Sequence, residues 1–429
     1  MSKSEWRVSR LLVRAVLALF VLSPLSAQAA IYEVDRLTDL DPAGGGEGSG
    51  LVGDFRFAIV HALSGDAITI QVTGTIELAA GLPAISQNIC IKGPGAHLST
   101  VRGVGSSVFQ VDAGASVNLT GFQITGGRGN GGGILNRGSL TVNGAVISGN
   151  SAGDPTNGDG TGGGIWNYIG ATLVLNGSVV SENSAIGNLS YAASRGGGIA
   201  NYGNLTLNNS TVSGNVASQG SGGGIACPLP GTTLTLVNST ISGNSSPGTI
   251  GGGGIDNRGT FTARNSIVAG NADGDLFGNV ASEGFNLFGA VNGSGFAPTD
   301  LIDVAPLLGP LQDNGGSTPT MVPLVGSPAV DRIPGTAGID FPSTDQRGIA
   351  RPQGSMADCG AVEVESSQPA QPRGRGLGPQ SPQSSGATPE AQAQSASPRM
   401  PVVLADPVRP APRAVSVRSS GGVEPCSPQ

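Results

Sequence analysis

The 429-residue sequence carries little charge and few aromatic side chains: 12% of its residues are charged and 4% are Phe, Trp or Tyr. Lys3 and Lys92 are its only lysines, and His61 and His97 are its only histidines. Residues 31–365 hold twelve basic against twenty-five acidic residues. Because nucleic-acid binding needs a face rich in Lys and Arg, this composition argues against a nucleic-acid partner. A Ser/His/Asp triad would have to use one of the two histidines.

Cysteine is also scarce, and no Cys-x-x-Cys pair that would indicate a zinc or redox site occurs. Four isolated cysteines in so long a chain do not predict a disulfide framework, so we expect buried, small apolar residues, with Cys426 in the tail exposed. Their disulfide state is left open. The four are Cys90, Cys227, Cys359 and Cys426.

Long hydrophobic runs are missing apart from the one that extends from Ala15 to Leu22. This run follows a basic segment and precedes the Ala-Gln-Ala of residues 27–29, the small-x-small pattern of a signal-peptide cleavage site. A membrane span would need roughly twenty apolar residues. Residues 1–30 are therefore predicted to be a signal peptide. The mature chain is expected to lack a transmembrane segment and to be extracellular, at the cell surface or retained in the periplasm.

The last part of the chain, residues 366–429, is rich in Pro, Ser, Gln and Ala. Such a composition buries too little apolar surface to offset the entropy lost on ordering, so a disordered tail is predicted. Its six arginines outnumber its three acids, whereas residues 31–365 are acidic.

Glycine is abundant, with 72 residues, and much of it is placed periodically. Five Gly-Gly-Gly-Ile segments recur at spacings of 31, 34, 26 and 30 residues, the range typical of solenoid repeats. In each unit an Asn or Cys lies two residues after the isoleucine, and a second Asn lies ten residues after an apolar residue. The isoleucines are Ile134, Ile165, Ile199, Ile225 and Ile255; the residues after them are Asn136, Asn167, Asn201, Cys227 and Asn257; the second asparagines are Asn150, Asn183, Asn215, Asn244 and Asn271.

Short alternating segments such as Leu140-Thr141-Val142 predict strands with one buried face. Strands this short cannot pair within one unit, but they can pair with equivalent strands one turn away, at about 4.8 Å. Asn tolerates a left-handed corner, and its amide can bond the amides above and below. We therefore predict an all-β, right-handed, single-stranded parallel β-helix over residues 67–290, with two Asn ladders, one interrupted by Cys227. A β-propeller is the alternative, but its blades usually need about 40–45 residues.

Both ends of such a helix expose an open core and need caps. Residues 31–66 form the predicted N-terminal cap, because residues 55–63 place apolar side chains on one face of a short helix. His61 is expected to belong to this capping helix or its surface. The apolar residues of the face are Phe55, Ile59, Ala62 and Leu63. Short strands are predicted after the cap at residues 67–72, 89–92, 108–111 and 117–119.

From Asn265 to Val364 the sequence resembles the C-terminal region of bacterial choice-of-anchor Q β-helix proteins. The matching segments, in the order of that family, are NSIVAGN, GFNLFG, PLLGPLQDNGGSTPTMVPLVGSPAVD, DQRGIARPQG and DCGAVE. The segment DFRFAIVHALSGDAITI resembles a degenerate CSLREA-type cap without its usual Cys-Ser-Leu-Arg-Glu-Ala. The central repeats are similar to those of polymorphic outer-membrane proteins, with Gly replacing Ala in Gly-Gly-Ala-Ile.

These resemblances imply an exported or surface-exposed bacterial β-helix of the pectin-lyase-like fold, with residues 291–365 closing its C-terminal end. Members of the family commonly continue into an anchoring or sorting tail. This sequence departs from that pattern, because it ends in VEPCSPQ without an apolar segment or a basic terminus. Surface attachment is therefore not implied.

Many parallel β-helices resemble pectin-degrading enzymes, which makes a polysaccharide lyase or hydrolase the enzymatic hypothesis, although a fold alone is weak support. Hydrolysis needs two carboxylates across one groove. A lyase would use Ca²⁺ and an Arg or Lys base, yet the repeats contain no lysine. The candidate Ca²⁺ loops hold aspartate pairs, Asp154 with Asp159 and Asp273 with Asp275, and solvated turns are the alternative. No catalytic residue is assigned, and no cofactor is expected besides this Ca²⁺.

Aromatic residues, rare elsewhere, gather on neighbouring repeats. The residues directly after the first-ladder residues form one column: Arg137, Tyr168, Tyr202, Pro228 and Arg258. The residues directly before them form a second column: Leu135, Trp166, Ala200, Ala226 and Asp256. Because strand side chains alternate, both columns are expected to point outward. Rings at strand spacing can stack on sugar rings, and Arg can bind acidic groups; the alternative is that these residues only cover the corner backbone.

Two long loops, residues 151–161 and 184–195, come from neighbouring turns and are expected to extend the same face. The candidate ligand-binding residues are Trp166, Tyr168, Tyr202, Tyr191, Arg137 and Arg195. The sequence thus favours a non-enzymatic binding or adhesion module for a glycan or a cell-surface protein. The alternatives are the polysaccharide lyase or hydrolase and an inert structural spacer. Neither the ligand nor the oligomeric state is specified.

Overall fold

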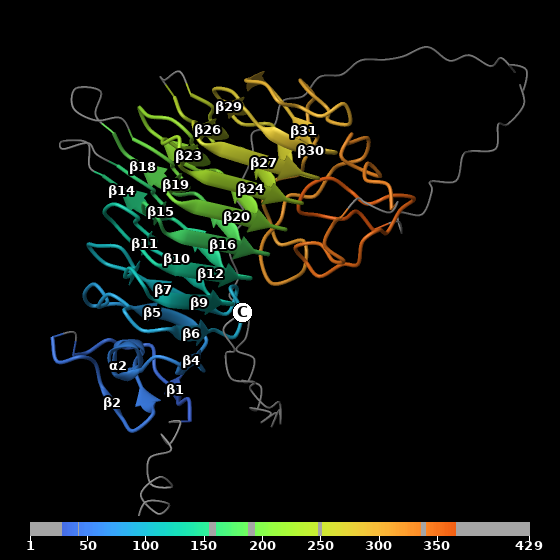
Figure 1. Cartoon of the computed structure of the whole chain (residues 1–429). Coiled ribbons are helices and arrows are strands. Elements are labelled where there is room, and N and C mark those ends of the chain that lie inside the picture. The colour runs from blue at the N-terminus through green and yellow to red at the C-terminus, as the bar shows by residue number, and fades with distance from the viewer. Residues whose placement is uncertain are drawn as a thin grey trace, which may run out of the picture. The chain divides into compact units, whose positions relative to one another are not determined.

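The computed structural model describes residues 28–41, 43–153, 160–187, 194–247, 251–335 and 340–365. Nearly all regular structure in these ranges is β-strand, and strands of successive turns pair in parallel along three long sheets (Figure 1). The chain is therefore a parallel β-helix, which confirms the predicted fold class. Residues 1–27 of the predicted signal peptide and the tail, residues 366–429, lie outside the described residues.

Each full turn contributes one strand to each of the three long sheets, which we call sheets A, B and C. In order along the axis, sheet A comprises β2 (Gly48–Ser49), β3 (Val52–Gly53), β1 (Ile31–Val34), β4 (Ala67–Ile70), β6 (Ile89–Lys92), β9 (Ser116–Thr120), β12 (Ser139–Asn143), β16 (Thr172–Asn176), β20 (Asn204–Asn208), β24 (Thr233–Val237), β27 (Thr260–Arg264) and β30 (Ala281–Gly284). Sheet B comprises β5 (Gly74–Glu77), β7 (Ser99–Arg102), β10 (Gln123–Thr125), β13 (Val146–Ser148), β17 (Val179–Ser181), β21 (Thr211–Ser213), β25 (Thr240–Ser242), β28 (Ile267–Val268) and β31 (Leu287–Phe288).

Sheet C starts each repeat at the isoleucine that follows the glycine triplet. Its strands are β8 (Phe109–Val111), β11 (Ile134–Asn136), β15 (Ile165–Asn167), β19 (Ile199–Asn201), β23 (Ile225–Cys227), β26 (Ile255–Asn257), β29 (Leu276–Phe277) and β32 (Val291–Asn292). A small fourth sheet, D, lies between B and C in the chain and comprises β14 (Ser151–Ala152), β18 (Ser184–Ala185) and β22 (Val216–Ala217).

The core is a stack of apolar columns inside the three sheets. Equivalent residues pair in exact register, as Leu173 does with Leu205 and Ile165 with Ile199. These side chains are 0–1% exposed, and full burial of one Leu or Ile contributes roughly 1.5–3 kcal/mol. The apolar surface that no single turn could bury alone therefore becomes interior when turns stack.

The second Asn ladder is continuous over five turns, as predicted. Each Asn donates from Nδ2 to Oδ1 of the Asn on the next turn, at 2.8–3.0 Å, and the backbone N–H bonds the same oxygen. The ladder ends at Asp275, whose Oδ1 accepts from Asn271 Nδ2 at 2.8 Å. Because donation runs in one direction, the last member needs only to accept, and a carboxylate does that.

The first ladder is interrupted at the predicted position. Asn136 donates to Asn167, and Asn167 donates to Asn201, at 2.8 Å each. Asn201 then meets Cys227 Sγ at 3.6 Å, a weaker acceptor than an amide oxygen. Burial raises the pKa of the Cys227 thiol to about 12, so this thiol stays neutral.

The glycine triplets are required because the chain doubles back closely on itself ahead of each strand of sheet C. The first glycine is left-handed in every triplet but the last, as in Gly162 with φ +64°, where a Cβ would overlap the backbone of Ile165 and Trp166. The second glycine, such as Gly197, abuts the carbonyls of Val216 and Gly223 from neighbouring segments. The third leaves room for the amide of a second-ladder Asn.

One left-handed corner is occupied by a residue that disfavours it. Glu182 has φ +56° in a column where the other turns carry Gly149, Gly214, Gly243 and Gly270. A left-handed backbone costs a non-glycine residue roughly 1–2 kcal/mol. Glu182→Gly is therefore expected to raise the free energy of unfolding by about 1 kcal/mol, measured by urea denaturation. A decrease would contradict this account of the corner.

The N-terminal end is closed by α2, which spans Phe55–His61 and begins at the N-cap Asp54. The Phe55 ring packs edge-on against Phe109 of β8, the first strand of sheet C, with ring centroids 5.9 Å apart, as expected of a cap. Leu63 lies beyond the end of the helix and is 69% exposed. Its predicted place on the apolar face was therefore wrong, because Ala62 leaves the helical conformation. The His61 ring stacks on Phe57 in the cap.

Residues after β32 first cover the C-terminal end and then pass along the outside of sheet B. The Phe296 ring packs on Phe288, with centroids 5.2 Å apart. Further along, Gln346 accepts a hydrogen bond from Thr211, and the Ala361 N–H donates to Thr240 Oγ1 at 3.0 Å. These contacts explain why the strands of sheet B from β13 to β28 are buried on both faces.

The expectation for the cysteines holds for two of them. Cys227 and Cys359 are free and buried. Cys90, half-buried on the outside of β6, is disulfide-bonded. Burial was therefore the wrong expectation for Cys90, because its side chain points away from the core; Cys426 lies outside the described residues.

The segments DQRGIARPQG (residues 345–354) and DCGAVE (residues 358–363) form a compact buried polar network. Arg351 and Glu363, both fully buried, form an ion pair at 3.1 Å. Burial raises the pKa of the nearby Asp358 carboxyl to about 6, above the roughly 3.9 of an unfolded chain. The folded state therefore binds this proton more tightly. The stabilisation is complete below pH 4 and is lost as the pH rises through about 6.

Wild-type protein is accordingly expected to lose about 2 kcal/mol of unfolding free energy between pH 4 and pH 7 relative to Asp358→Asn, which cannot titrate there. Urea denaturation of both proteins at the two pH values measures the difference. Parallel pH profiles for the two proteins would contradict the raised pKa of Asp358.

Candidate functional site

The clearest grouping of candidate residues lies where sheet C turns toward sheet A. Trp166 and Tyr168 are on β15 and its following turn, and Tyr202 follows β19 on the next turn. The Trp166 ring centroid lies 5.1 Å from that of Tyr168 and 6.0 Å from that of Tyr202, both in edge-on geometry. The structure thus brings together three of the aromatic residues named from the sequence, and we call this group, with Arg137, the aromatic corner.

Arg137 belongs to the preceding turn, where it follows β11. Its guanidinium carbon lies 5.9 Å from the Tyr168 ring centroid, a distance at which a cation is attracted to the face of a ring. Arg137 and Tyr168 are exposed, Tyr168 at 38%. The corner therefore combines a positive charge with an accessible aromatic surface.

Trp166 carries a polar atom that the described residues do not satisfy. Its Nε1 is buried, and no hydrogen-bond acceptor among the described residues reaches it. A buried indole N–H normally finds a partner, and leaving it unpaired costs free energy. Ser194 Oγ and Asp256 Oδ1, also on the sheet C side of the repeats, are buried and unpaired in the same sense.

The expectation that both columns beside the first ladder point into solvent was wrong for the preceding column and, in the following column, for Pro228, which is buried. Ala200 and Ala226 are fully buried, Asp256 is 1% exposed and Leu135 7% exposed. The reason is the glycine corner, which folds back over the outer side of sheet C: a Cβ on Gly131 would lie 3.0 Å from Leu135 Cα. Only Trp166, the largest member of this column, remains partly exposed.

Other predicted binding residues are less closely placed. Arg195 lies on a bridge between Thr161 and Ser221 on adjacent turns and is half-buried. Tyr191 lies outside the described residues, as do most residues of the two long loops. Two exposed apolar residues that sequence reasoning missed, Ile169 at 62% and Leu229 at 36%, lie on the same run of corners. The sequence signal was present, because each of the two lies two residues after a first-ladder residue, Asn167 or Cys227.

The predicted aspartate pairs occupy unlike environments. Asp275 is buried, and its two oxygens accept from Asn271 and from the N–H of Ala290 at 2.7–2.8 Å. Burial raises the pKa of this carboxyl, against the opposing effect of those hydrogen bonds. Asp273 is exposed and accepts from Ser245 and Ser246 at 3.2 Å. Asp154 and Asp159 lie outside the described residues.

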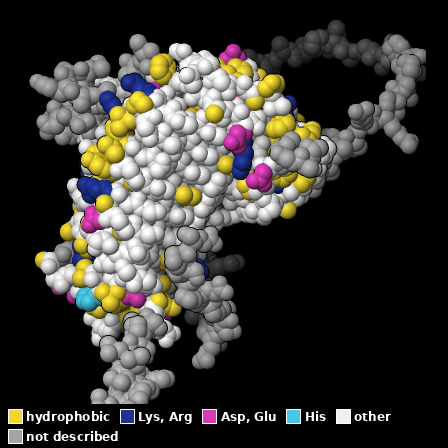
Figure 2. All heavy atoms as spheres, in the orientation of Figure 1, with side chains coloured by type: hydrophobic (Ala, Val, Ile, Leu, Met, Phe, Trp, Pro, Cys, Tyr) yellow, Lys and Arg dark blue, Asp and Glu magenta, His cyan; other side chains and the backbone are white. Residues whose placement is uncertain are grey.

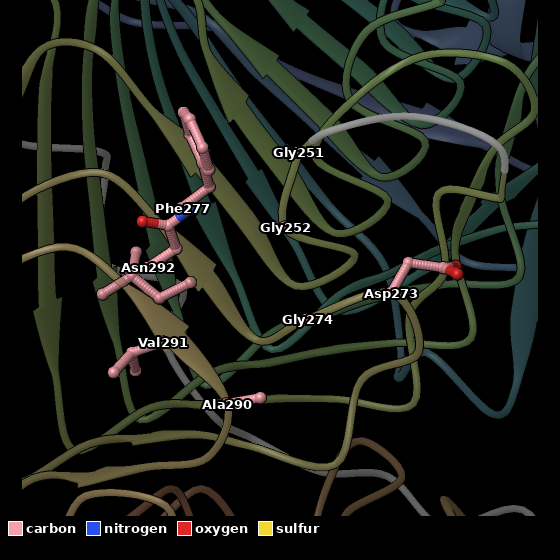
Figure 3. A pocket seen from close by; sticks show the side chains of 9 residues that line it. Gly251, Gly252, Asp273, Gly274, Phe277, Ala290, Val291 and Asn292 are labelled. Atoms are coloured by element: carbon pink, nitrogen blue, oxygen red, sulfur yellow. The ribbon is translucent and has the colours of Figure 1, made fainter.

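Within the described ranges, no group of three or more His, Cys, Asp or Glu side chains is arranged to hold a metal ion. A shallow pocket of about 240 Å³ lies beside Asp273, and Figure 3 shows Asp273 on the side opposite Phe277 and Asn292. It is smaller than the roughly 300–1,000 Å³ typical of small-molecule sites. Its lining brings no second carboxylate to Asp273.

No helix of the described part of the chain is long and apolar enough to cross a bilayer. No family model matches the sequence, and no curated protein matches it. Among solved structures, pectate lyase Pel9A superposes with a TM-score of 0.39 and 15% identity, covering 79% of this chain and 97% of that chain. So low a score carries no argument about activity. The strand pairing itself places this chain among the parallel β-helices.

Proposed function

We propose that the protein is an exported, non-enzymatic binding or adhesion module that recognises a glycan through the aromatic corner. The observation that carries the proposal is the packing of Trp166 between Tyr168 and Tyr202 on two adjacent turns. In a chain that is 4% aromatic, this concentration at one partly exposed place calls for a reason beyond filling the core. Aromatic rings present a rigid apolar face beside a polar tip, which suits the alternating C–H and O–H surfaces of a sugar ring.

The polar groups of the corner support the same reading. The unpaired Trp166 Nε1 is buried, so the accessible polar group of the corner is the Arg137 guanidinium. Arg137, held beside the Tyr168 ring, supplies a positive charge for an acidic substituent. Trp166 lies on β15 and Arg137 directly follows β11, so both side chains are positioned before a ligand arrives and little ordering has to accompany binding.

The turn spacing adds a constraint on the ligand. Corner side chains recur about every 4.8 Å along the axis, the distance between paired strands. An extended oligosaccharide lying parallel to the axis would therefore meet Arg137, Tyr168 and Tyr202 on successive turns. Binding is expected to strengthen with the number of sugar units until the corner is covered.

Native gel electrophoresis of the full chain through gels that contain soluble polysaccharides tests the proposal. Retardation by a particular polysaccharide is expected for wild type and for Val325→Ala, a control at a 93% exposed position. The double variant Trp166→Ala, Tyr202→Ala is expected to migrate as if no polysaccharide were present. Its far-ultraviolet circular dichroism should match wild type. Retention of binding by the double variant would place the site elsewhere, and cleavage of the polysaccharide would indicate an enzyme instead.

A further inference from the structure

The outer face of sheet A from β9 to β27 is a regular polar array. In each of these five-residue strands the second and fourth residues are buried and the first, third and fifth point outward. Every outward position is Ser, Thr or Asn except Val174, Val237 and Arg264. The middle outward column consists of Asn118, Thr141, Val174, Thr206, Thr235 and Thr262. We call this surface the polar array.

The array is regular in two directions. All strand pairs from β9 to β27 are parallel and in register, and the register first shifts at Ala263/Arg264, where β27 meets β30. Equivalent side chains are therefore about 4.8 Å apart along the axis, and outward neighbours within a strand are about 6.6–6.8 Å apart. Figure 1 shows these strands side by side on one face, and Figure 2, in the same orientation, shows that face largely free of charged side chains.

Hydrogen bonds hold many of these side chains in fixed orientations. Along the third outward column, Asn176 donates to Asn143 and Asn208 donates to Asn176, at 2.9 Å each. Asn143 also donates to Asn118 of the middle column at 2.8 Å. In the first column, Thr233 donates to Asn204 at 2.9 Å. The groups are thus ordered before any partner arrives, which lowers the entropy cost of binding.

The described part of the chain leaves the first two columns of the array uncovered. Hydrogen bonds with residues 300–365 are made at corners after β16, β20 and β27, as from Asn209 Nδ2 to the Thr344 carbonyl, and on the outside of sheet B. The one cation of the array, Arg264, is paired with Glu283 and Asp340 at its edge. The uncovered columns are therefore electrically neutral and carry only hydroxyl, amide and methyl groups.

These properties decide which partner the array fits. A charged partner finds no opposite charge there, and a pyranose face finds no aromatic ring of the kind that recognises it. A dissolved solute gains little, because each hydrogen bond to it replaces one to water and contributes only about 0.5–1.5 kcal/mol net. A partner with a fixed repeat is different, because many such contacts form at once on a face that is already ordered.

Ordered water has a repeat close to that of the array. In a tetrahedral network with O···O distances of about 2.75 Å, second-neighbour oxygens lie about 4.5 Å apart. This is within about 0.3 Å of the spacing between turns, a difference that side-chain rotation can absorb over a few turns. We propose that the polar array binds an ordered water lattice, the surface of an ice crystal, with the Ser, Thr and Asn side chains occupying lattice positions.

Partition of the full chain between slowly growing ice and the remaining liquid tests this proposal. Wild type is expected to be enriched in the ice. Thr206→Lys places a long charged side chain at the centre of the array and is expected to lower that enrichment about tenfold, because several contacts are lost together. Thr75→Lys, the same change at a half-buried position on β5 of sheet B, should partition like wild type. Both variants should keep the wild-type melting temperature because both side chains point outward.

Exclusion of wild type from ice would overturn the proposal, as would equal losses in Thr206→Lys and Thr75→Lys. Binding to crystalline cellulose or chitin that Thr206→Lys abolishes, with no ice binding, would assign the array to a neutral polysaccharide surface and also overturn it. The double variant Trp166→Ala, Tyr202→Ala should partition into ice like wild type. This result separates the array from the aromatic corner, so that either proposal can fail alone.

Discussion

Asn215→Ala is expected to lower the free energy of unfolding by about 4 kcal/mol, the first of the two largest effects anticipated for this chain. Asn215 lies in the middle of the second ladder and is fully buried. Its Oδ1 accepts from the backbone N–H and the Nδ2 of Asn183, and its Nδ2 donates to Asn244 and to the Val180 carbonyl. Removing the amide leaves several buried groups without a partner, each at a cost of about 1–3 kcal/mol.

The matched control for this change is Asn204→Ala in the same repeat. Asn204 is exposed, and its side chain accepts one hydrogen bond, from Thr233. Its loss is expected to cost about 0.5 kcal/mol. Urea denaturation followed by circular dichroism measures both variants. Equal, small effects would mean that the ladder contributes little to stability and that apolar stacking alone holds the turns together.

Gly197→Ala is expected to be at least as damaging, although it adds a single methyl group. Gly197 is the second glycine of its triplet, and its Cβ would lie 2.6 Å from the Gly223 carbonyl oxygen and overlap the Val216 carbonyl. These obstacles are backbone atoms of neighbouring segments, which cannot rotate away as a side chain can. We expect a loss of about 4 kcal/mol or more, or failure to accumulate as soluble protein.

Gly231→Ala provides the control, since no heavy atom lies within 4 Å of the Cβ position and Gly231 is not left-handed. This change is expected to be neutral or to stabilise slightly, because it reduces the freedom of the unfolded chain. Soluble yield and urea denaturation distinguish the two. Tolerance of Ala at Gly197 would show that the close approach of the triplets is not required.

The sequence predicted most of the fold because the repeat constrains it. Equal offsets from Ile199 to Asn201 and from Leu205 to Asn215, repeated in every unit, can be satisfied only if turns stack in register, so sheets A and C and both ladders followed. The serine ladder, in which the Ser210 N–H donates to Ser239 Oγ, was missed. Its signal, a serine two residues after the end of β16, β20, β24 and β27, was present in the same repeat.

The course of the chain outside the repeat was harder to predict. Residues 300–365 lack periodicity, and their contacts with Thr211 and Thr240 depend on side chains more than 100 residues away. The burial of Ala200 beneath a glycine corner was missed for a related reason. Alternation along a strand indicates which side chains point outward, but it does not reveal what covers them. The aromatic corner was found because Trp166, Tyr168 and Tyr202 are rare residues at repeat positions.

The most direct test of the central claim, that the aromatic corner recognises a glycan, is binding of the purified full chain to a glycan array, with and without a Ca²⁺ chelator. The account predicts saturable binding to a restricted set of extended glycans, unchanged by the chelator, since the corner consists of aromatic rings and Arg137. Binding lost on chelation would contradict it and direct attention to Asp273. An array without any bound glycan would equally contradict it and leave a protein partner or a structural spacer.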